Sequence, residues 1–535
     1  MKLSPRILAL ALAGMVSSCA QNDRLTSVTP PATPVFDLSQ NLPLVFDVEN
    51  TGANIATTVP TFNQSPSNLI LPDPFRSFNG NIDVTFAGWE RHRAEVKAAI
   101  ETDEIGPKPS PSDLTETATF AANTLSVVVT RKSNGRSITF KSPVFLPSGT
   151  GPFPAVIGMT WICFPPFFPC TGTGSLPTDI FTSRNIARIP YFHDQATTYI
   201  DFSGAGHAND PFFRLYPEYS VGEGNVGQYT AWAWGVSRLI DGIQIAARQG
   251  SLPIDVSHLA VTGCSYAGKM ALYAGALDER VALTIAQESG GGGMPAWRVS
   301  EAIGDPRDAV EHIDNTNYTW FAHQMRQFSG TNVYKLPEDH HQLMAMVAPR
   351  ALLATNNYDY IWLSNPAAWV SARAAQEAYR QLGVSDRFGY IDDGSVTGNA
   401  HNHCSVPASQ LPAISAFVDK FLLGQDVDTN IAAAHVSPYT DADVDSRGWM
   451  PWALRNDIAQ LVDQGTLTAD QGAGLTDKVN AFVGSISSAQ LTPARNQMNA
   501  FLNQVSAFVG NGKLTQAQAD VLVGKINATK TRLGL

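Results

Sequence analysis

The sequence predicts an α/β fold in which a doubly wound, mostly parallel sheet forms the middle layer of a three-layer αβα sandwich, followed by a small all-α domain. Short apolar runs alternate with helical patterns between residues 125 and 423, which is typical of parallel sheets. One run leads into a turn of small residues around Ser265, and a helix follows directly. A change of composition near Pro438 begins the helical domain. Ligands of such sheets bind beyond the carboxyl ends of the strands.

The individual elements follow from the spacing of the apolar residues. Strands are predicted where apolar or alternating runs of roughly four to eight residues stand between turn residues, and helices where apolar residues recur every three or four positions. The predicted strands are residues 125–130, 137–145, 154–159, the run that begins at 259, 281–286, 350–354 and 388–391, the last of them. The predicted helices are residues 89–104, 230–249, the segment after Ser265, 367–382 and 411–423.

Composition and charge limit the classes of function. The 535-residue chain is long enough for one large domain with appendages, and its 44% hydrophobic and 16% charged residues indicate a well-filled core. The net charge of −11 argues against binding to nucleic acid or to an anionic membrane surface through a basic field. A neutral or polymeric substrate fits this charge better; the alternative is that the acidity serves solubility alone.

The N-terminus has the pattern of an export signal. Two basic residues precede an apolar run at 7–16 that is too short for an ordinary membrane-spanning helix, so residues 1–18 form the predicted lipoprotein signal peptide. The Val-Ser-Ser-Cys ending resembles a bacterial lipobox, which makes Cys19 the predicted lipidated residue and the lipid anchor the predicted membrane contact. Gln21, by resemblance to sorting rules, favours the outer membrane; plain secretion is the alternative.

Three regions follow the signal peptide. Residues 19–67, rich in Pro, Thr, Ser and Asn, form the predicted flexible tether, and residues 68–437 form the α/β domain. Within residues 438–535, the segment 467–475 recurs as 514–522, which indicates a two-copy helical repeat. This region resembles the FIMAH domain, a helical appendage of secreted bacterial proteins. The resemblance implies attachment to glycan or to the cell surface; an inert stabilising cap is the alternative.

The cysteines predict disulfides. Four cysteines remain when Cys19 is set aside, and an even number in an exported protein indicates pairing, with three pairings possible. Cys163 and Cys170 bracket a Phe/Pro-rich loop and are expected to pair locally, which leaves Cys264 with Cys404. Each of the latter two adjoins a candidate catalytic residue.

The strand–turn–helix segment Leu259–Lys269 is a predicted nucleophile elbow, the turn that exposes a serine hydroxyl at the top of an α/β-hydrolase sheet. Strand and helix nearly touch at such a turn, so small residues must flank Ser265, and Gly263, Ala267 and Gly268 meet that need. The strict G-x-S-x-G spelling is not met, because the downstream glycine stands one place late.

A serine hydroxyl needs a base within hydrogen-bond reach. His401 and His403 both lie after the predicted last strand, where this fold presents its general base. His403 is favoured because it adjoins Cys404, and a bridge to Cys264 would hold it close to Ser265. A metal site at the two histidines is the weaker alternative, since no carboxylate cluster lies nearby. No metal and no cofactor is predicted.

The base in turn needs an acid that orients it, and two carboxylates qualify. Glu288 directly follows the predicted strand 281–286, and Asp359 follows the next strand, 350–354. Both give the order serine, acid, histidine along the chain that α/β-hydrolases show. Either carboxylate could equally lie on the surface or cap a loop, so the choice between them stays open at this point.

The motifs around these residues resemble the glucuronoyl esterases, carbohydrate esterase family 15. The resemblance covers roughly residues 68–437 and rests on Gly263–Lys269, Gly275–Gly290, Trp297-Arg298, Trp320-Phe321, Leu336–His341, Ala348–Arg350 and His401–Cys404. It implies a cofactor-free serine esterase that hydrolyses the ester between a 4-O-methyl-glucuronic acid branch of xylan and a lignin alcohol. The implied substrate is therefore a glucuronate-bearing polysaccharide or a small ester of it.

The resemblance assigns roles to named residues. Ser265 matches the family's nucleophile, His403 its base and Glu288 its usual acid, while some bacterial members use an aspartate near Asp359. The Cys264–Cys404 pair matches the family disulfide.

The implied sugar contacts come from Lys269, which reaches a sugar hydroxyl, and from a tryptophan near Trp362 that lines the sugar subsite. One departure is Tyr266, which stands where the family has an arginine that helps to hold the oxyanion. Loss of one such donor typically costs about 2.7–4 kcal/mol of transition-state stabilisation. The backbone N–H of Tyr266 remains a predicted oxyanion donor, and its phenol is a second candidate donor that offers no positive charge. Two alternatives follow from this departure: a carboxylesterase of different specificity, or a catalytically weak glycan-binding lipoprotein.

Overall fold

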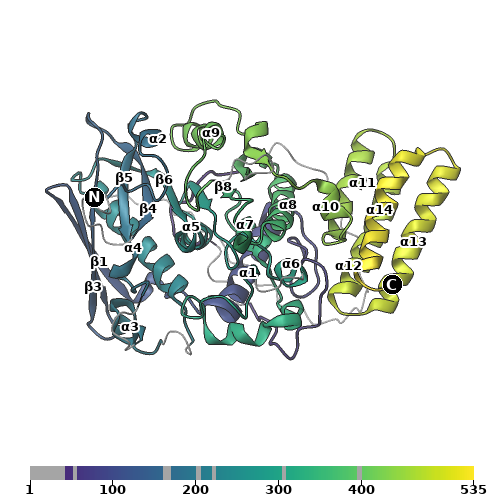
Figure 1. The fold of residues 1–535 in the computed structure, drawn as a ribbon, viewed down its shortest axis with the longest axis horizontal. Coiled ribbons are helices and arrows are strands. Elements are labelled where there is room, and N and C mark those ends of the chain that lie inside the picture. The colour runs from purple at the N-terminus through teal and green to yellow at the C-terminus, as the bar shows by residue number, and fades with distance from the viewer. Residues whose placement is uncertain are drawn as a thin grey trace, which may run out of the picture.

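The computed structural model describes residues 42–51, 57–160, 170–200, 206–219, 225–303, 309–393 and 401–535. Its centre is a seven-stranded sheet in the order β10-β9-β8-β7-β6-β4-β5, and each neighbouring pair is parallel (Figure 1). The prediction of a doubly wound, mostly parallel sheet is confirmed. The strands are β4 (Phe153–Thr160), β5 (Ala187–Phe192), β6 (Ile254–Cys264), β7 (Leu283–Gln287), β8 (Ala351–Asn356), β9 (Phe388–Asp392) and β10 (His435–Val436).

Helices cover both faces of this sheet, with α2 and α9 on one side and α4 and α5 on the other (Figure 1). Successive residues of a strand point to opposite faces, so Ala260 packs with α2 and α9 while Val261 packs with α4 and α5. The helices before and around the sheet are α1 (Phe86–Ala99), α2 (Asp179–Thr182), α3 (Pro211–Leu215), α4 (Gln228–Arg248), α5 (Tyr266–Leu277), α6 (Trp297–Ala302), α7 (His340–Ala345), α8 (Asn365–Gln381) and α9 (Leu411–Phe421).

A smaller antiparallel sheet of β1 (Leu114–Ala121), β2 (Thr124–Arg131) and β3 (Ser137–Pro143) packs against α4. Its strands alternate buried and more exposed residues, as expected for a sheet with one face on the core.

The structure differs from the predicted elements in several places, and the strands β1 and β5 and the short helices α2, α3, α6 and α7 were not predicted. The predicted last strand, 388–391, is β9, and the two-residue β10 follows it at the sheet edge, too short to leave a periodic signal. The predicted helix 89–104 ends as α1 at Ala99 and continues as a π-helical turn, Ile100–Ile105. In the described part of the chain, no helix has the length and apolar character that crossing a membrane requires.

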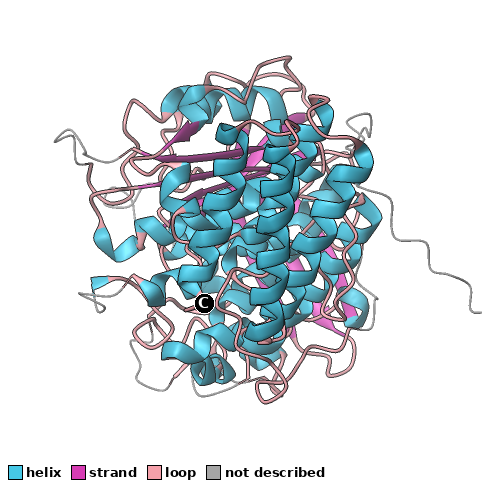
Figure 2. Cartoon of the chain, turned by 90° about the vertical axis from the view of Figure 1, so that its right-hand side faces the viewer, coloured by secondary structure: helices cyan, strands magenta, loops and turns pink. Residues whose placement is uncertain are grey.

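The C-terminal region is helical, as predicted, and its repeat is visible in how two helices begin. Thr468 caps α12 and Thr515 caps α14, and each cap exchanges hydrogen bonds with the glutamine three residues later. Figure 2, seen from this end, shows the helices in front of the sheet. They are α10 (Asp441–Asp445), α11 (Leu454–Asp463), α12 (Ala469–Ser487), α13 (Leu491–Gly510) and α14 (Gln516–Arg532).

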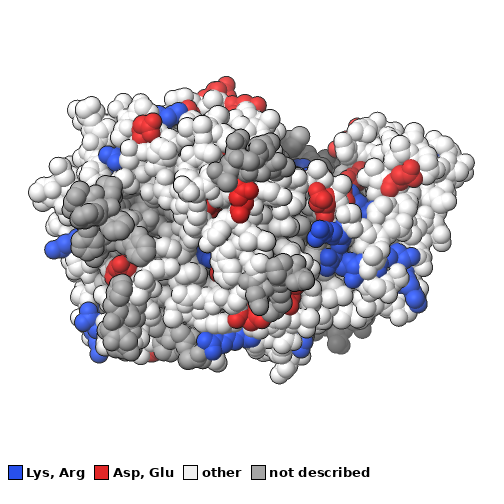
Figure 3. Space-filling view, in the orientation of Figure 1, with Lys and Arg blue, Asp and Glu red and all other residues white. Residues whose placement is uncertain are grey.

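The C-terminal helices share an apolar cluster with the α/β domain. Ile70, Leu71 and Val370 of that domain pack with Leu454 and Phe482 of the helical region in one buried group. In the space-filling view the helices form a smaller body joined to the larger one, with Lys and Arg side chains gathered at the junction (Figure 3). The boundary at 437/438 stays a prediction, but the two regions are packed together in the part of the chain described.

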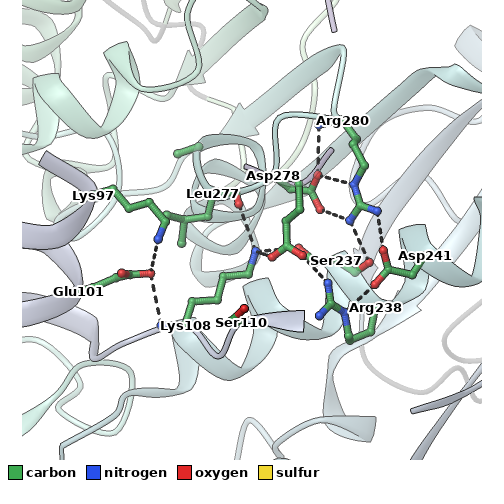
Figure 4. Close-up of polar contacts among 12 residues, drawn as sticks. Lys97, Glu101, Lys108, Ser110, Ser237, Arg238, Asp241, Leu277, Asp278 and Arg280 are labelled. Carbon is green, nitrogen blue, oxygen red and sulfur yellow. Dashed lines mark hydrogen bonds and ion pairs between the residues drawn. The ribbon is translucent and has the colours of Figure 1, made fainter. Parts of the chain in front are cut away.

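A charge network lies beside the turn that follows α5 (Figure 4). Arg280 pairs with Asp278 at 2.7 Å and with Asp241 of α4, and Asp241 also pairs with Arg238 at 2.7 Å. Lys108 reaches the same region from the segment after α1 and donates to the carbonyl of Leu277 at 3.1 Å. The network ties α4, the α5–β7 turn and the segment after α1 together, so it supports the end of α5, the helix that begins at the elbow.

One described segment of the predicted tether, residues 42–51, contacts the α/β domain. Phe46 N–H donates to the carbonyl of Glu279 at 3.1 Å, and Glu279 N–H donates to the carbonyl of Glu49 at 2.9 Å. The Glu49 carboxylate pairs with Lys108 at 2.6 Å, and Leu42 is buried. Residues 42–51 therefore lie against the α/β domain. Backbone hydrogen bonds and an ion pair hold this segment, although its sequence has no hydrophobic periodicity. Residues 1–41, which include the predicted signal peptide and Cys19, lie outside the described residues.

A buried ion pair crosses the junction with the C-terminal helices. Both terminal nitrogens of Arg455 on α11 reach the carboxylate of Asp73, at 2.6 and 2.7 Å. Burial works to raise the pKa of Asp73, but the charge and hydrogen bonds of Arg455 outweigh it and lower the pKa. The folded state therefore holds Asp73 as a charged group that needs this partner.

We expect Arg455→Met to lower the free energy of unfolding by about 3–5 kcal/mol, because it leaves a buried carboxylate without its cation. Urea or thermal unfolding measures this. Adding Asp73→Asn should recover part of the loss, whereas Arg495→Met, at an exposed position of α13, should change little. A loss below about 1 kcal/mol for Arg455→Met would contradict the structural role of the pair.

Buried carboxylates also gather around the π-helical turn. Asp103 and Glu104 of this turn are buried, and Glu104 Oε2 lies 2.7 Å from Nε2 of His340. Burial, together with the charge of Glu104, raises the pKa of Asp103 to about 7. Because the unfolded chain releases this proton near pH 4 and the folded protein near pH 7, the stability of the fold falls as pH rises through that interval.

Asp103→Asn should therefore be more stable than wild type at pH 8, by about 1–3 kcal/mol, with the difference shrinking toward pH 4. Unfolding midpoints at the two pH values test this. Asp477→Asn, at an exposed site of α12, serves as the control. Equal shifts at both pH values for Asp103→Asn would show that the charge of Asp103 is not the cause.

Candidate active site

The predicted elbow has the backbone conformation of a strained turn. β6 ends at Cys264 and α5 begins at Tyr266, so Ser265 alone makes the turn, with φ 60° and ψ −128°. Its N–H donates to the carbonyl of Gln287 at 3.0 Å, and its carbonyl accepts from Lys269 N–H at 3.0 Å. A serine at positive φ is uncommon, and such residues concentrate at functional sites.

Close packing explains why the flanking positions are glycine. A Cβ at position 263 would lie 2.3 Å from the carbonyl oxygen of Ala267, and a Cβ at position 268 would lie 2.2 Å from that of Gln287. Both distances are far below contact distance, so neither glycine tolerates a side chain. Gly268 is the residue that packs against the end of β7. This contact explains why the second glycine of the elbow stands three residues after Ser265, one place later than in G-x-S-x-G.

The carboxylate of Glu288 lies at the same level of the sheet as the elbow. Cys264 pairs with Gln287 across β6 and β7, so Ser265 and Glu288 leave adjacent strand ends side by side. Glu288 has φ 44°, its N–H donates to the carbonyl of Thr355 at 2.7 Å, and it is 2% exposed. The register of parallel strands therefore brings the predicted acid next to the predicted nucleophile.

Glu288 accepts hydrogen bonds from both predicted histidines. His403 Nδ1 lies 2.6 Å from Oε2 and His401 Nε2 lies 3.2 Å from Oε1, while the N–H of Cys404 donates to Oε2 at 3.0 Å. Burial works to raise the pKa of Glu288, but these bonds prevail and lower it. The bond to Glu288 also raises the pKa of His401 against the effect of its burial. The carboxylate is thus held ionised and fixes the ring of His403.

A disulfide joins the two sides of the site. Cys264 and Cys404 are bonded, with their Cα atoms 5.7 Å apart. A ligand atom from each of these cysteines, from Glu288 and from His403 lies within 4.8 Å of the others. The bridge brings the neighbours of the two cysteines, Ser265 and His403, to one place, and it leaves neither sulfur as a thiolate for a metal. Cys170 is also disulfide-bonded, but its predicted partner Cys163 lies outside the described residues.

Asp359, the alternative acid, lies in the loop after β8. Its side chain is exposed, and its N–H donates to Oδ1 of Asn357 at 3.2 Å. Its charge contributes to the raised pKa of His401, after the larger effects of Glu288. Both imidazoles donate hydrogen bonds to the Glu288 carboxylate, which makes Glu288 the better candidate for the acid.

Tyr266 belongs to an aromatic cluster that the sequence did not indicate. Its hydroxyl lies 3.0 Å from Nε2 of His193, and its ring stacks on Tyr199 with centroids 4.1 Å apart. Burial and the charge of Asp194 raise the pKa of its phenol, which keeps it protonated. Tyr266 is also the first residue of α5, so its backbone N–H is at the helix start, where negative charge is favoured. The phenol is engaged with His193, and the predicted oxyanion donor is the backbone.

Lys269 lies on α5 and is buried beside the elbow. Its Nζ pairs with Oε2 of Glu311 at 2.8 Å and lies 4.8 Å from the ring centroid of Trp320. Burial lowers the pKa of Lys269, and the charge of Glu311 works in the opposite direction. The N–H of Glu311 donates to the carbonyl of Trp362 at 3.2 Å, so the two predicted sugar contacts meet through a residue that sequence spacing did not reveal.

This arrangement has the parts of nucleophilic acyl transfer: a serine on an elbow, an imidazole on a loop that a disulfide bonds to the elbow strand, and a buried carboxylate that orients the imidazole. Ser265 and His403 stay the predicted nucleophile and base, and the contacts of Glu288 support it as the acid.

Comparisons with known proteins agree on one family. A family model described as glucuronyl esterase, fungi, matches residues 129–383. Curated relatives include 4-O-methyl-glucuronoyl methylesterase 1 of Phanerochaete chrysosporium, 36% identical over 75% of this chain and 78% of its own. The 4-O-methyl-glucuronoyl methylesterase of Thermothelomyces thermophilus is 33% identical over 80% of this chain and 97% of its own.

Solved structures with the same fold include the glucuronoyl esterase catalytic domain from Hypocrea jecorina, with a TM-score of 0.61 and 34% identity over 72% of this chain and 96% of that one. Another is a serine-to-alanine mutant of the glucuronoyl esterase from Sporotrichum thermophile, in complex with methyl 4-O-methyl-β-D-glucopyranuronate. It has a TM-score of 0.61 and 30% identity over 75% of this chain and 98% of that one.

The identity of the acid can be tested without a substrate. A fluorophosphonate probe labels an activated serine, and Glu288→Gln should slow the labelling of Ser265 by about 10²–10⁴-fold because the imidazole loses its orienting charge. Asp359→Asn, a matched change at the exposed carboxylate, should slow it by less than about 3-fold. Labelling rates of the folded variants decide between the two. A larger loss for Asp359→Asn would assign the acid to Asp359.

Proposed function

The chain belongs to the glucuronoyl esterase family, and we propose that it hydrolyses esters of 4-O-methyl-glucuronic acid through a covalent Ser265 intermediate. The family membership follows from relatives more than 30% identical over three quarters of the chain. The observation that carries the mechanism is the 2.6 Å contact between Glu288 and His403, on a loop bonded by disulfide to the elbow.

In the first half of the reaction, the Ser265 oxygen attacks the ester carbonyl while His403 takes the hydroxyl proton. The tetrahedral intermediate collapses, the bond to the alcohol oxygen breaks, and His403 gives its proton to the leaving alcohol. In the second half, water replaces the alcohol, and His403 takes a proton from the water as it attacks the acyl-enzyme. Glucuronic acid leaves and Ser265 recovers its proton. Glu288 stays ionised throughout and stabilises the imidazolium, as the lowered pKa of Glu288 allows.

The negative oxygen of the tetrahedral intermediate needs hydrogen-bond donors at the start of α5. The backbone N–H of Tyr266 is the donor that the elbow geometry offers. The Tyr266 side chain is a phenol and carries no positive charge, so we expect weaker oxyanion support than an arginine would give.

The uronate part of the substrate is proposed to bind on the side of Lys269 and Trp362. Lys269 and Glu311 place a cation and a carboxylate together next to the elbow, a pairing suited to sugar hydroxyls, which donate and accept. Trp362 is half-buried in the turn after β8, and a half-exposed tryptophan is a common surface for stacking. The alternatives, a carboxylesterase of different specificity or a glycan-binding lipoprotein, are not favoured by relatives named as glucuronoyl methylesterases.

Export, the lipid anchor at Cys19 and a role in lignocellulose degradation are proposals of the same kind. The Cys264–Cys404 bond supports export, because disulfides persist in oxidising compartments. Attachment of residues 438–535 to glycan or to the cell surface finds support in a cavity of about 310 Å³ between α8 and helices α10, α11 and α14. Its lining is rich in charged and amide groups, including the Arg373–Asp441 pair at 2.7 Å, and such groups bind polar ligands.

The proposed activity predicts selective cleavage of uronate esters. Wild type should cleave benzyl glucuronate with a kcat/KM at least about 10-fold above that for a butyryl ester of similar reactivity, because only the uronate meets Lys269 and Trp362. Ser265→Ala and His403→Ala should each lower kcat on benzyl glucuronate by about 10³-fold or more, since the serine and the imidazole act as a unit. Product release followed by chromatography measures both. Equal rates on the two ester classes would contradict the uronate specificity.

A further inference from the structure

The cavity of about 310 Å³ where the C-terminal helices meet the α/β domain has the form of a second ligand site. One wall is α8, and the other is built from α10, α11 and α14, the helices next to α8 in Figure 1. The residues that line the cavity are distinct from those of the candidate active site. Its volume is at the lower end of the range of about 300–1,000 Å³ that small-molecule sites occupy.

The charged side chains of the first wall are matched in sign. Arg373 of α8 pairs with Asp441 of α10 at 2.7 Å, which joins the two walls. Arg380 pairs with Glu377 at 3.0 Å within α8. An ion that entered the cavity would meet charged groups that already have partners, so the cost of removing that ion from water would not be repaid.

Lys525 of α14 provides the cation of the second wall and lies between two carboxylates. Its Nζ is 2.9 Å from Asp457 of α11 and 3.5 Å from Asp445 of α10. Burial raises the pKa of Asp445, the charge of Lys525 works against this rise, and the charge of Asp457 adds to it. A carboxylate in this position gains from further hydrogen-bond donors and is repelled by another anion.

The helical repeat shows that this use of the lysine belongs to one copy alone. Lys525 of the second copy stands at the position of Lys478 in the first copy. Nζ of Lys478 donates to the carbonyl of Gly474, one turn earlier in its own helix, at 3.1 Å. Lys525 instead reaches two other helices and lines the cavity. The two copies share the residue type, so the difference lies in what surrounds each lysine.

The rest of the lining combines apolar surface with uncharged polar groups. Val444, Met450 and Ala453 contribute apolar surface, and Asn456 and Gln460 contribute amides. Sugars have the same two characters, because their hydroxyls donate and accept hydrogen bonds while their C–H faces pack on apolar groups. Carboxylates accept from hydroxyls, lysine and arginine donate to them, and amides do both. A neutral saccharide therefore matches the cavity better than an ion or a wholly apolar ligand.

We propose that this cavity is a second saccharide site, separate from the active site, and that it binds neutral sugar units in preference to uronates. The inference deepens the proposed attachment of residues 438–535 to glycan and rests on it. The preference follows from the carboxylates of the lining, which repel the carboxylate of a uronate. Two sources of neutral sugar share this chemistry: the main chain of a polymer that carries the ester, and a glycan of the cell surface.

The test is calorimetric titration of the full-length chain with three probes: the hexamers of xylose, of N-acetylglucosamine and of galacturonic acid. At least one of the two neutral hexamers should bind about 10-fold or more tightly than the acidic one, since like charges oppose the acidic hexamer. Tighter binding of the xylose hexamer would assign the site to the main chain of a polymer. Tighter binding of the N-acetylglucosamine hexamer would assign it to a cell-surface glycan.

Two cavity variants and one matched control locate the binding. Lys525→Met should raise the dissociation constant of the neutral hexamer at least about 10-fold, because it removes a charged donor. Gln460→Ala, at an exposed position that leaves the ion pairs in place, should raise the same constant about 2- to 5-fold. Lys478→Met, the same change in the first copy of the repeat, should leave it unchanged. All three variants should keep the wild-type kcat/KM on benzyl glucuronate.

The possible failures can be told apart. Neutral hexamers that do not bind, or whose binding neither Lys525→Met nor Gln460→Ala weakens, would overturn the site. Tighter binding of the galacturonic acid hexamer would overturn the preference for neutral sugars, and its insensitivity to both cavity variants would place glycan attachment elsewhere in the chain. Wild type that binds a neutral hexamer through the cavity but cleaves no glucuronate ester would overturn the proposed esterase activity and leave the saccharide site supported.

Discussion

The site depends on a covalent link between parts of the chain that are far apart in sequence. Cys264 ends β6 and Cys404 follows the last long strand of the sheet, at a sequence separation of 140. The register of β6 with β7 brings Glu288 to the same level, and the N–H of Cys404 donates to its carboxylate. The disulfide and the carboxylate therefore hold the loop of His403 from two sides. A base on a loop needs such support, because a misplacement of about 1 Å costs catalysis heavily.

Two imidazoles share the Glu288 carboxylate, and their surroundings separate their roles. The side chain of His403 is 32% exposed, whereas that of His401 is 7% exposed. A base must meet both a substrate and water, so accessibility favours His403. His401 has its Nε2 directed at Glu288 and a raised pKa, so its hydrogen bond adds to the stabilisation of the ionised acid. The shared carboxylate thus carries one accessible and one buried partner.

The sequence predicted the parts of the site that obey local rules. The elbow could be predicted because a Cβ has no room at positions 263 and 268, so both residues are glycine. The sheet could be predicted because buried parallel strands are apolar runs in the sequence. Glu311 and His193 were not visible, since they lie outside periodic elements and reach Lys269 and Tyr266 only through tertiary contacts. The ordered segment 42–51 was missed for the same reason. Residue type and spacing show what a turn or a strand requires locally. They do not show which side chain from a distant part of the sequence contacts a residue of the site.

Helix α8 connects the C-terminal helices to the active site. Its first residue, Asn365, holds the turn that carries Tyr360. Further along α8, Val370 and Ala374 pack into the apolar cluster shared with α11 and α12. A helix moves as a rigid rod over such a distance, so the packing at its side and the position of its start are coupled. The helical region therefore packs against the same helix whose first residue holds the turn beside His403.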